Sequence, residues 1–170
     1  MTTSTSTGAL YYYDTFATPC GPFTAAVNHD GALVATAFGE LTELEHRFRK
    51  APSRLTRYTE RTAEVRRQIL AYFAGDLRDF TLPLAAEGTP FQQQIWQALV
   101  NIPFGQTRSY GEIAEQVGNP AASRAVGRAN GANPICLIVP CHRVIGANGS
   151  MTGFAFGEDI KRQLLAHESV

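Results

Sequence analysis

One short stretch of the chain contains residue types that can do covalent chemistry. In "IVPCHRVIGANG", residues 138–149, Cys141 follows a proline and directly precedes His142 and Arg143. A thiol beside a base or a cation loses its proton more readily, and the thiolate is both the nucleophile and the metal ligand. Cys141 is therefore a candidate nucleophile, a candidate metal ligand or a packed core thiol.

The other cysteines narrow these interpretations. Cys136 lies inside the apolar run "CLIV" and is predicted to be a small buried side chain. Cys136, Cys141 and His142 offer donor atoms, but their spacing matches no zinc ribbon or finger. Cys20 and His29 add no full ligand set, so we predict no metal. A cysteine hydrolase stays an alternative, because it would use the same thiol with a base and an oxyanion hole.

Composition limits the class of protein. The 170 residues suffice for one ordinary domain or two small ones, and 44% apolar residues allow a packed core. No apolar run is long enough to span a bilayer, and the polar residues 1–8 are predicted to be a disordered tail. An odd number of cysteines fits reduced thiols and a cytoplasmic protein. A net charge of zero argues against a strongly basic nucleic-acid binder but allows a local basic surface.

The first half of the chain is predicted to be a small antiparallel sheet with a helix. The aromatic run 10–16 is β-prone, and Asp30 with Gly31 between two apolar runs predicts a hairpin. A stretch rich in Pro and Gly follows the helix. We therefore place a domain boundary near residue 85, which gives domains 1–85 and 86–170.

The helix of the first half is predicted over residues 60–76. Val65, Ile69 and Phe73 recur at steps of four and share one face. Gly75 is a suitable residue to end the helix.

The second half has the sequence signals of several short helices. Thr89 is a predicted N-cap with Pro90 at the first helical position. Ser109, followed three residues later by Glu112, is a predicted capping box, and Gly118 is a suitable C-terminal stop.

A second helix is predicted to follow at once. Asn119 is its expected cap, Pro120 its first residue and Gly131 its stop. Two short helices so close together are typical of a helix-turn-helix, whose recognition helix would carry Arg124 and Arg128. The alternative is that its small residues only let helices pack closely.

Together these residues carry a family resemblance. "PCHRVIG", preceded by "RAVGRANGANP" and followed by "KRQLLAHE", closely resembles the O6-alkylguanine-DNA alkyltransferases. The resemblance is strong over residues 85–168, while the first half fits in length and general character. It implies an α/β fold with a small N-terminal ribonuclease-H-like α/β domain. A mostly helical, winged-helix-like DNA-binding domain would follow and bind the minor groove.

The resemblance also implies a reaction. Such a protein repairs O6-alkylguanine in DNA, with O4-alkylthymine as a further candidate substrate, by moving the alkyl group onto its own cysteine. The base must be flipped out of the stack, and the thioether product allows one turnover per molecule. The resemblance implies no metal or organic cofactor. The expected partner is double-stranded DNA containing O6-alkylguanine, with no membrane partner, and the protein is expected to be a monomer, with cooperative binding to DNA as an addition.

Catalytic roles follow from the resemblance residue by residue. It implies that Cys141 accepts the alkyl group and that His142 acts through a water as its general base. Glu168 would orient that histidine, since a carboxylate fixes the imidazole tautomer. Asn133 would brace the turn that links the recognition helix to the nucleophile.

The same resemblance implies contacts with DNA. Tyr110 would touch the base and the 3′ phosphate, and Arg124 would enter the duplex and fill the gap. The carbonyls of Cys141 and Val144 would accept the guanine amino group. Further DNA or substrate contacts are expected from Ser123, Arg128, Phe154 and the backbone N–H of Ala155.

The loop "GFAFGED" departs from the family pattern. Phe154 stands where a tyrosine is frequent, and Phe156 where a glycine is frequent. Phe156 adds bulk and removes backbone freedom. We therefore expect methyl transfer with a reduced tolerance for large alkyl groups.

Two other classes of protein are kept as alternatives. A non-enzymatic damage-binding protein would flip and hold the lesion, but it would require an unreactive Cys141. A helix-turn-helix regulator that senses alkylation or redox state through Cys141 would require sequence-specific operator binding. No dimerisation element for a palindromic site is visible in the sequence.

Overall fold

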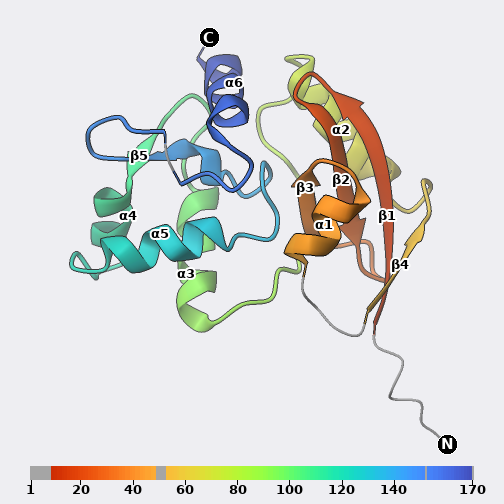
Figure 1. Cartoon of the computed structure of the whole chain (residues 1–170), viewed down its shortest axis with the longest axis horizontal. Coiled ribbons are helices and arrows are strands. Elements are labelled where there is room, and N and C mark those ends of the chain that lie inside the picture. Colours follow the sequence, from red (N-terminus) through yellow and green to blue (C-terminus); the bar gives the residue numbers. More distant parts are fainter. Residues whose placement is uncertain (1–8, 49–52, 152, 170) are drawn as a thin grey trace, which may run out of the picture. The chain divides into compact units, whose positions relative to one another are not determined.

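The computed structural model describes residues 9–48, 53–151 and 153–169. The chain divides into two compact units, Met1–Ala86 and Glu87–Val170 (Figure 1). The predicted tail, residues 1–8, lies outside the described residues. Among the helices of the described part, none has the length and hydropathy needed to cross a membrane.

The first unit is built on a four-stranded sheet with the order β3-β2-β1-β4. The strands are β1 (Ala9–Thr18), β2 (Gly21–Val27), β3 (Leu33–Phe38) and β4 (Ser53–Arg57). The pairs β1–β2 and β2–β3 are antiparallel, as predicted, but β4 lies parallel to β1. The wholly antiparallel sheet was therefore a wrong prediction. Its cause is helix α1 (Leu41–Arg47), because a helical crossover after β3 delivers the next strand in the parallel direction.

The predicted hairpin joins β2 to β3. The side-chain Oδ1 of Asn28 accepts hydrogen bonds from the backbone N–H of Asp30 and of Ala32, each at 3.0 Å. Gly31 has a φ of +83°, which glycine adopts without steric strain. The hairpin prediction is confirmed.

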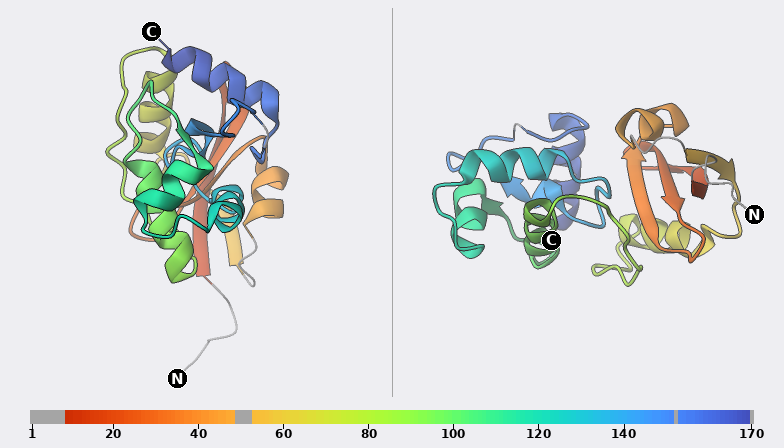
Figure 2. Two further views of the ribbon diagram at one scale, coloured as in Figure 1. Left: turned by 90° about the vertical axis from the view of Figure 1, so that its left-hand side faces the viewer. Right: turned by 90° about the horizontal axis from the view of Figure 1, so that it is seen from below.

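Helix α2 (Ala63–Phe73) covers one face of the sheet, and α1 lies on the other face (Figure 2). Ile69 and Tyr72 are fully buried, whereas Phe73, predicted for the same face, is only half-buried. Because a helix has 3.6 residues per turn, each step of four overshoots a full turn by about 40°. Two such steps rotate Phe73 out of the buried stripe. Gly75, with a φ of +86°, follows the helix end as predicted.

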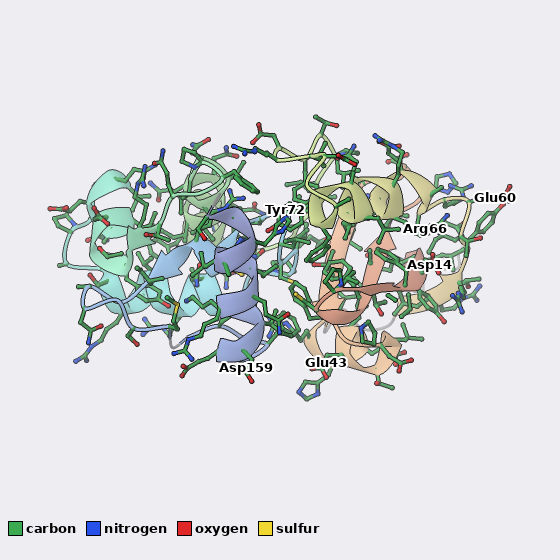
Figure 3. All side chains as sticks on the ribbon, turned by 90° about the horizontal axis from the view of Figure 1, so that it is seen from above. Asp14, Glu43, Glu60, Arg66, Tyr72 and Asp159 are labelled. Atoms are coloured by element: carbon green, nitrogen blue, oxygen red, sulfur yellow. The ribbon has the colours of Figure 1, made fainter. Side chains whose placement is uncertain are left out.

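A buried carboxylate ties the sheet of this unit to α2. Asp14 on β1 is 2% exposed and accepts hydrogen bonds from two arginines. Arg57 of β4 donates from Nε at 3.2 Å and from Nη2 at 3.0 Å, and Arg66 of α2 donates from Nη1 at 2.6 Å. Figure 3 shows the side chains of Asp14 and Arg66 lying side by side.

The second unit contains helices and one two-stranded parallel sheet. Its helices are α3 (Pro90–Val100), α4 (Tyr110–Gln116), α5 (Ser123–Gly131) and α6 (Glu158–Glu168), and its strands are β5 (Arg108–Ser109) and β6 (Val144–Ile145). Helices α4 and α5 pack on each other, as a helix-turn-helix pair does. The indole Nε1–H of Trp96 donates to the carbonyl of Ala129 at 2.8 Å and so joins α3 to α5.

Both predicted helix starts of α3 and α4 are confirmed. Thr89 Oγ1 accepts from the N–H of Gln92 at 3.1 Å, and Pro90 occupies the first turn. Ser109 Oγ accepts from the N–H of Glu112 at 3.1 Å, while the Glu112 carboxylate accepts from the N–H of Ser109 at 2.7 Å. Both are complete capping boxes.

The predicted start of α5 is wrong. The helix begins at Ser123, and its N-cap Ala122 makes no side-chain capping bond. Asn119 instead closes a turn, because its carbonyl accepts from the N–H of Ala122 at 3.0 Å. Gly118 has a φ of +80°, so the chain leaves α4 sharply and uses residues 119–122 to turn before the next helix. The predicted end at Gly131 is confirmed.

Asp14→Asn tests how much the buried carboxylate stabilises the first unit. Loss of the charge should lower the free energy of unfolding by about 1.5–3 kcal/mol, the range of hydrogen bonds to charged groups. The measurement is urea denaturation. Glu64→Gln is the control, because Glu64 pairs with Arg67 on the surface, where both side chains are more than half exposed. Equal effects of the two substitutions would contradict a special role of Asp14.

Candidate active site

The candidate nucleophile Cys141 lies on a short 3-10 helix, Cys141–Arg143, that leads into β6. It is 5% exposed, and its backbone N–H donates to the carbonyl of Val139 at 2.7 Å. The chain arrives through a tight turn in which Leu137 has a φ of +75°. A leucine in this region is strained, and its near-complete burial shows that packing holds it there.

Asn133 braces this turn from inside. It is 2% exposed, and its Nδ2 donates to the carbonyl of Val139 at 2.9 Å. Its Oδ1 accepts from the N–H of Ile135 at 3.0 Å. Both ends of the turn before Cys141 are thus held by one amide side chain that follows α5.

A buried network stands behind the thiol. His142 Nε2 lies 2.8 Å from Glu168 Oε2, which comes from the last residue of α6. Arg143 donates two hydrogen bonds to the same carboxylate, from Nε to Oε1 at 2.8 Å and from Nη2 to Oε2 at 3.0 Å. Its Nη1 donates to the carbonyl of Ile102 at 2.7 Å. The side chains of His142 and Glu168 are 0% and 1% exposed, so the network is buried away from bulk solvent.

The electrostatics of this network keep His142 neutral. Burial lowers the pKa of His142, the charge of Glu168 opposes that shift, and the cations Arg143 and Lys161 add to it. A neutral imidazole beside a carboxylate acceptor carries its proton on Nε2 and donates it there. Nδ1 is buried and has no hydrogen-bond partner among the described protein atoms. Its lone pair can therefore accept a proton.

Lys161 of α6 is also within electrostatic reach of the thiol. It is fully buried, and its Nζ donates to the carbonyl of Val144 at 2.6 Å. Burial lowers the pKa of Lys161, while the nearby Cys141 and Glu158 raise it. Lys161 therefore places a cation within electrostatic reach of the Cys141 sulfur.

Tyr110, the first residue of α4, is also within electrostatic reach of Cys141. Burial raises the pKa of the Tyr110 phenol, and the charge of Cys141 raises it further. The phenol therefore stays protonated and can donate. The DNA candidates Arg124 and Arg128 are exposed on α5, and Ser123 is half-buried at its start.

The loop "GFAFGED", which differs from the family pattern, follows β6 and runs into the start of α6. Phe154 is 8% exposed and packs against the half-buried Phe156, with ring centroids 5.7 Å apart at 64°. Ala155 between them is exposed, while the candidate acceptor Val144 is fully buried. The loop thus keeps an aromatic wall made from two rings.

The potential metal-ligating side chains form no metal site in the part of the chain that the structure describes. No three or more His, Cys, Asp or Glu side chains come together there. Cys20 lies in the turn between β1 and β2, in the other unit from Cys136 and Cys141.

Sequence reasoning missed three residues of the site. The roles of Arg143 as an anchor of Glu168 and of Lys161 as a buried cation were not foreseen. Asn130 was missed as well: it is 2% exposed on α5, and its Nδ2 donates to the carbonyl of Cys141 at 3.4 Å. A signal for Lys161 existed, because it lies seven residues before Glu168 and so shares its helix face.

The comparisons with known proteins agree over both halves of the chain. The family model for the 6-O-methylguanine DNA methyltransferase, ribonuclease-like domain matches residues 11–86, and that for the DNA binding domain matches residues 90–170. A methylated-DNA–protein-cysteine methyltransferase of Methanosarcina acetivorans is 49% identical, over 92% of this chain and 97% of that protein.

Two solved structures also match this chain over nearly its whole length. The crystal structure of a Mycobacterium tuberculosis O6-methylguanine methyltransferase is 46% identical, with a TM-score of 0.83, over 94% of this chain and 93% of that one. A Mycobacterium tuberculosis OGT in complex with DNA matches with a TM-score of 0.82 and 46% identity, over 93% of this chain and 92% of that one.

Fold and site define a two-domain protein in which a buried cysteine, backed by a histidine and a carboxylate, follows a helix-turn-helix. The chain belongs to the 6-O-methylguanine DNA methyltransferase family. This confirms the resemblance and the predicted fold class, a ribonuclease-like domain followed by a helical DNA-binding domain.

The pH dependence of stability tests the neutral state of His142. An unfolded histidine titrates near a pKa of about 6.5, and the folded pKa is lower. The stabilisation is therefore complete above about pH 6.5 and is lost as the pH falls toward the folded pKa, since the unfolded chain binds the extra proton. Urea denaturation at several pH values measures this loss.

Two variants make the comparison specific. His142→Gln should flatten the decline of stability below neutral pH. His167→Gln should keep it, because His167 is only half-buried and packs against the ring of Phe104, whereas His142 is fully buried and bonded to Glu168. An unchanged pH profile in His142→Gln would contradict the assignment.

Proposed function

We propose that this protein repairs O6-alkylguanine in double-stranded DNA by a single, irreversible transfer of the alkyl group to Cys141. The observation that carries the proposal is the buried series Cys141, His142 and Glu168 in a member of this family, with His142 neutral and held by Glu168 at 2.8 Å. The protein acts as a methylated-DNA–protein-cysteine methyltransferase that is consumed by its reaction. O4-alkylthymine is a second substrate of the same site.

The proposed reaction is a displacement at the alkyl carbon. Nδ1 of His142 accepts the thiol proton through a water, and Glu168 stabilises the imidazolium that forms. The sulfur of Cys141 bonds to the alkyl carbon as the carbon–O6 bond breaks, and the electron pair passes to the guanine. A proton or hydrogen bond from Tyr110 stabilises the departing base. The thioether is not hydrolysed, so each molecule reacts once.

The alkyl carbon lies inside a stacked duplex, so the nucleotide must be flipped out. In the proposal α5 enters the minor groove and Arg124 fills the space that the base leaves. Tyr110 supports rotation at the 3′ phosphate, and Ser123 and Arg128 add contacts to the backbone. The exposed positions of both arginines on α5 support these roles.

The flipped base would be read by backbone groups. The carbonyls of Cys141 and Val144 accept the guanine amino group, and the N–H of Ala155 donates to O6. Phe154 forms a wall of the alkyl pocket, and Asn133 holds the turn that carries the nucleophile. The reaction needs no metal or organic cofactor, because the thiol is both nucleophile and acceptor.

The proposal also covers the roles of the two domains, the location of the protein and its partner. Domain 86–170 binds DNA and carries the transfer, while domain 1–85 completes the fold. The protein works as a cytoplasmic monomer, with DNA as its partner and no membrane partner. The free cysteines Cys20, Cys136 and Cys141 support a reducing compartment.

Intact and peptide mass spectrometry tests the function. After mixing with duplex DNA containing O6-methylguanine, the peptide that contains Cys141 should gain one methyl group per molecule. Cys141→Ala should abolish the gain and still bind DNA. Cys136→Ala is the matched control, because Cys136 is equally buried, at 1% exposure against 5%, but plays no part in the transfer. DNA binding without any gain in the unmodified protein would favour a damage-binding protein.

Phe156 should restrict the size of the transferred group. Phe156→Gly removes a ring that packs on Phe154 and should raise the rate with O6-benzylguanine relative to O6-methylguanine. An increase of about tenfold in that ratio is expected, which corresponds to about 1.4 kcal/mol of differential transition-state stabilisation. The measurement is the rate constant with each substrate under single-turnover conditions. An unchanged ratio would contradict the restriction.

A further inference from the structure

Gly153, in the loop between β6 and α6, lies against the hydroxyl of Tyr110. A Cβ built on Gly153 would stand 2.6 Å from Tyr110 Oη and 3.7 Å from Cζ. Carbon and oxygen atoms without a bond do not approach to 2.6 Å, so any side chain at this position would displace the hydroxyl. Gly153 also has a φ of +93°, a conformation that favours glycine.

A second glycine faces the ring of the same tyrosine. A Cβ on Gly127 of α5 would stand 3.9 Å from Cδ1 and Cε1 of Tyr110, an ordinary van der Waals distance. The ring thus lies over α5 with room for one methyl group, while its hydroxyl end has no such room at Gly153. The phenol is rigid beyond two torsions, so its hydroxyl moves only if the whole ring moves.

The position of this hydroxyl bears on the reacting sulfur. The charge of Cys141 contributes to the raised pKa of Tyr110, which places the phenol within electrostatic reach of the nucleophile. A misplacement of about 1 Å at a reacting group can slow a reaction about a hundredfold. A residue that fixes the position of this hydroxyl can therefore influence the rate of transfer without itself contacting the alkyl group.

We propose that Gly153 is a positioning residue for the alkyl transfer, because its missing side chain lets the Tyr110 hydroxyl take its place beside the Cys141 site. The inference rests on the proposed function for the role of Tyr110 as a donor to the departing base. It goes beyond that function by assigning a specific part to the loop backbone, next to the wall residue Phe154.

The chain supplies a matched control in the same loop. Gly149 has a φ of +83°, close to that of Gly153, but nothing lies within 4 Å of a Cβ built on it. Gly149→Ala therefore carries similar backbone strain without the contact to Tyr110. Any difference between the two alanine variants reports the contact.

The test is a double-mutant cycle of Gly153→Ala and Tyr110→Phe. Phenylalanine removes Oη and leaves Cζ, at 3.7 Å, as the nearest atom to the new methyl group. Single-turnover rate constants are measured with duplex DNA containing O6-methylguanine, and dissociation constants with undamaged duplex. Gly153→Ala should slow transfer about tenfold or more in the parent protein, but less than about threefold in Tyr110→Phe, since residues in contact are not additive.

Gly149→Ala should slow transfer less than about threefold and should keep the dissociation constant for undamaged duplex within about threefold of the parent protein, because its new methyl group contacts nothing within 4 Å. Equal slowing by Gly153→Ala in both backgrounds, or equal slowing by Gly149→Ala, would overturn the proposal. Gly153→Asn is the substitute if the alanine variant does not fold, because asparagine tolerates positive φ and brings the same Cβ.

Urea denaturation of the four proteins of the cycle, the parent, the two single variants and the double variant, separates this inference from the proposed function. The contact predicts that Gly153→Ala lowers the unfolding midpoint more in the parent protein than in Tyr110→Phe, whether or not methyl is transferred. A parent protein that transfers no methyl would remove the function but leave this contact testable. Equal losses in both backgrounds would overturn the contact itself.

Discussion

The site depends on one buried carboxylate. Glu168 is removed from water, and burying a charge is costly unless it is paired and hydrogen-bonded. Arg143 supplies the pairing through two nitrogens, and His142 supplies the remaining bond. Because Arg143 also donates to the carbonyl of Ile102, the end of α6, the nucleophile turn and the segment after α3 are fixed to one another.

The same carboxylate sets the chemistry. A histidine in this dry position favours the neutral form, and the carboxylate decides which nitrogen carries the proton. Arg143 balances the charge of Glu168, so His142 is not forced to do so as a cation. The imidazole is left neutral, with the lone pair on its buried Nδ1 not engaged in a hydrogen bond among the described residues, and Lys161 adds positive charge within electrostatic reach of Cys141. The orientation of His142 and the charge around the thiol thus come from buried residues of two segments, Glu168 and Lys161 on α6 and Arg143 after Cys141.

Local features of the fold followed from the sequence, and features set by tertiary contacts did not. The capping boxes at Thr89 and Ser109 and the hairpin at Gly31 depend on residues within four positions, so their patterns were sufficient. The parallel placement of β4 depends on a crossover between distant strands. The site motif came from its resemblance to a family, but Asn130 gave no local signal, because its partner is the backbone of a residue eleven positions away.

In this site Glu168 holds a neutral His142 with its proton on Nε2. Nitrogen-15 NMR of the histidine side chains at neutral pH tests it directly, since the two tautomers and the imidazolium have distinct shifts and couplings to the ring protons. We predict a protonated Nε2 and an unprotonated Nδ1 for His142. A doubly protonated ring, or a proton on Nδ1, would contradict this protonation state, because neither form leaves Nδ1 free to take the thiol proton.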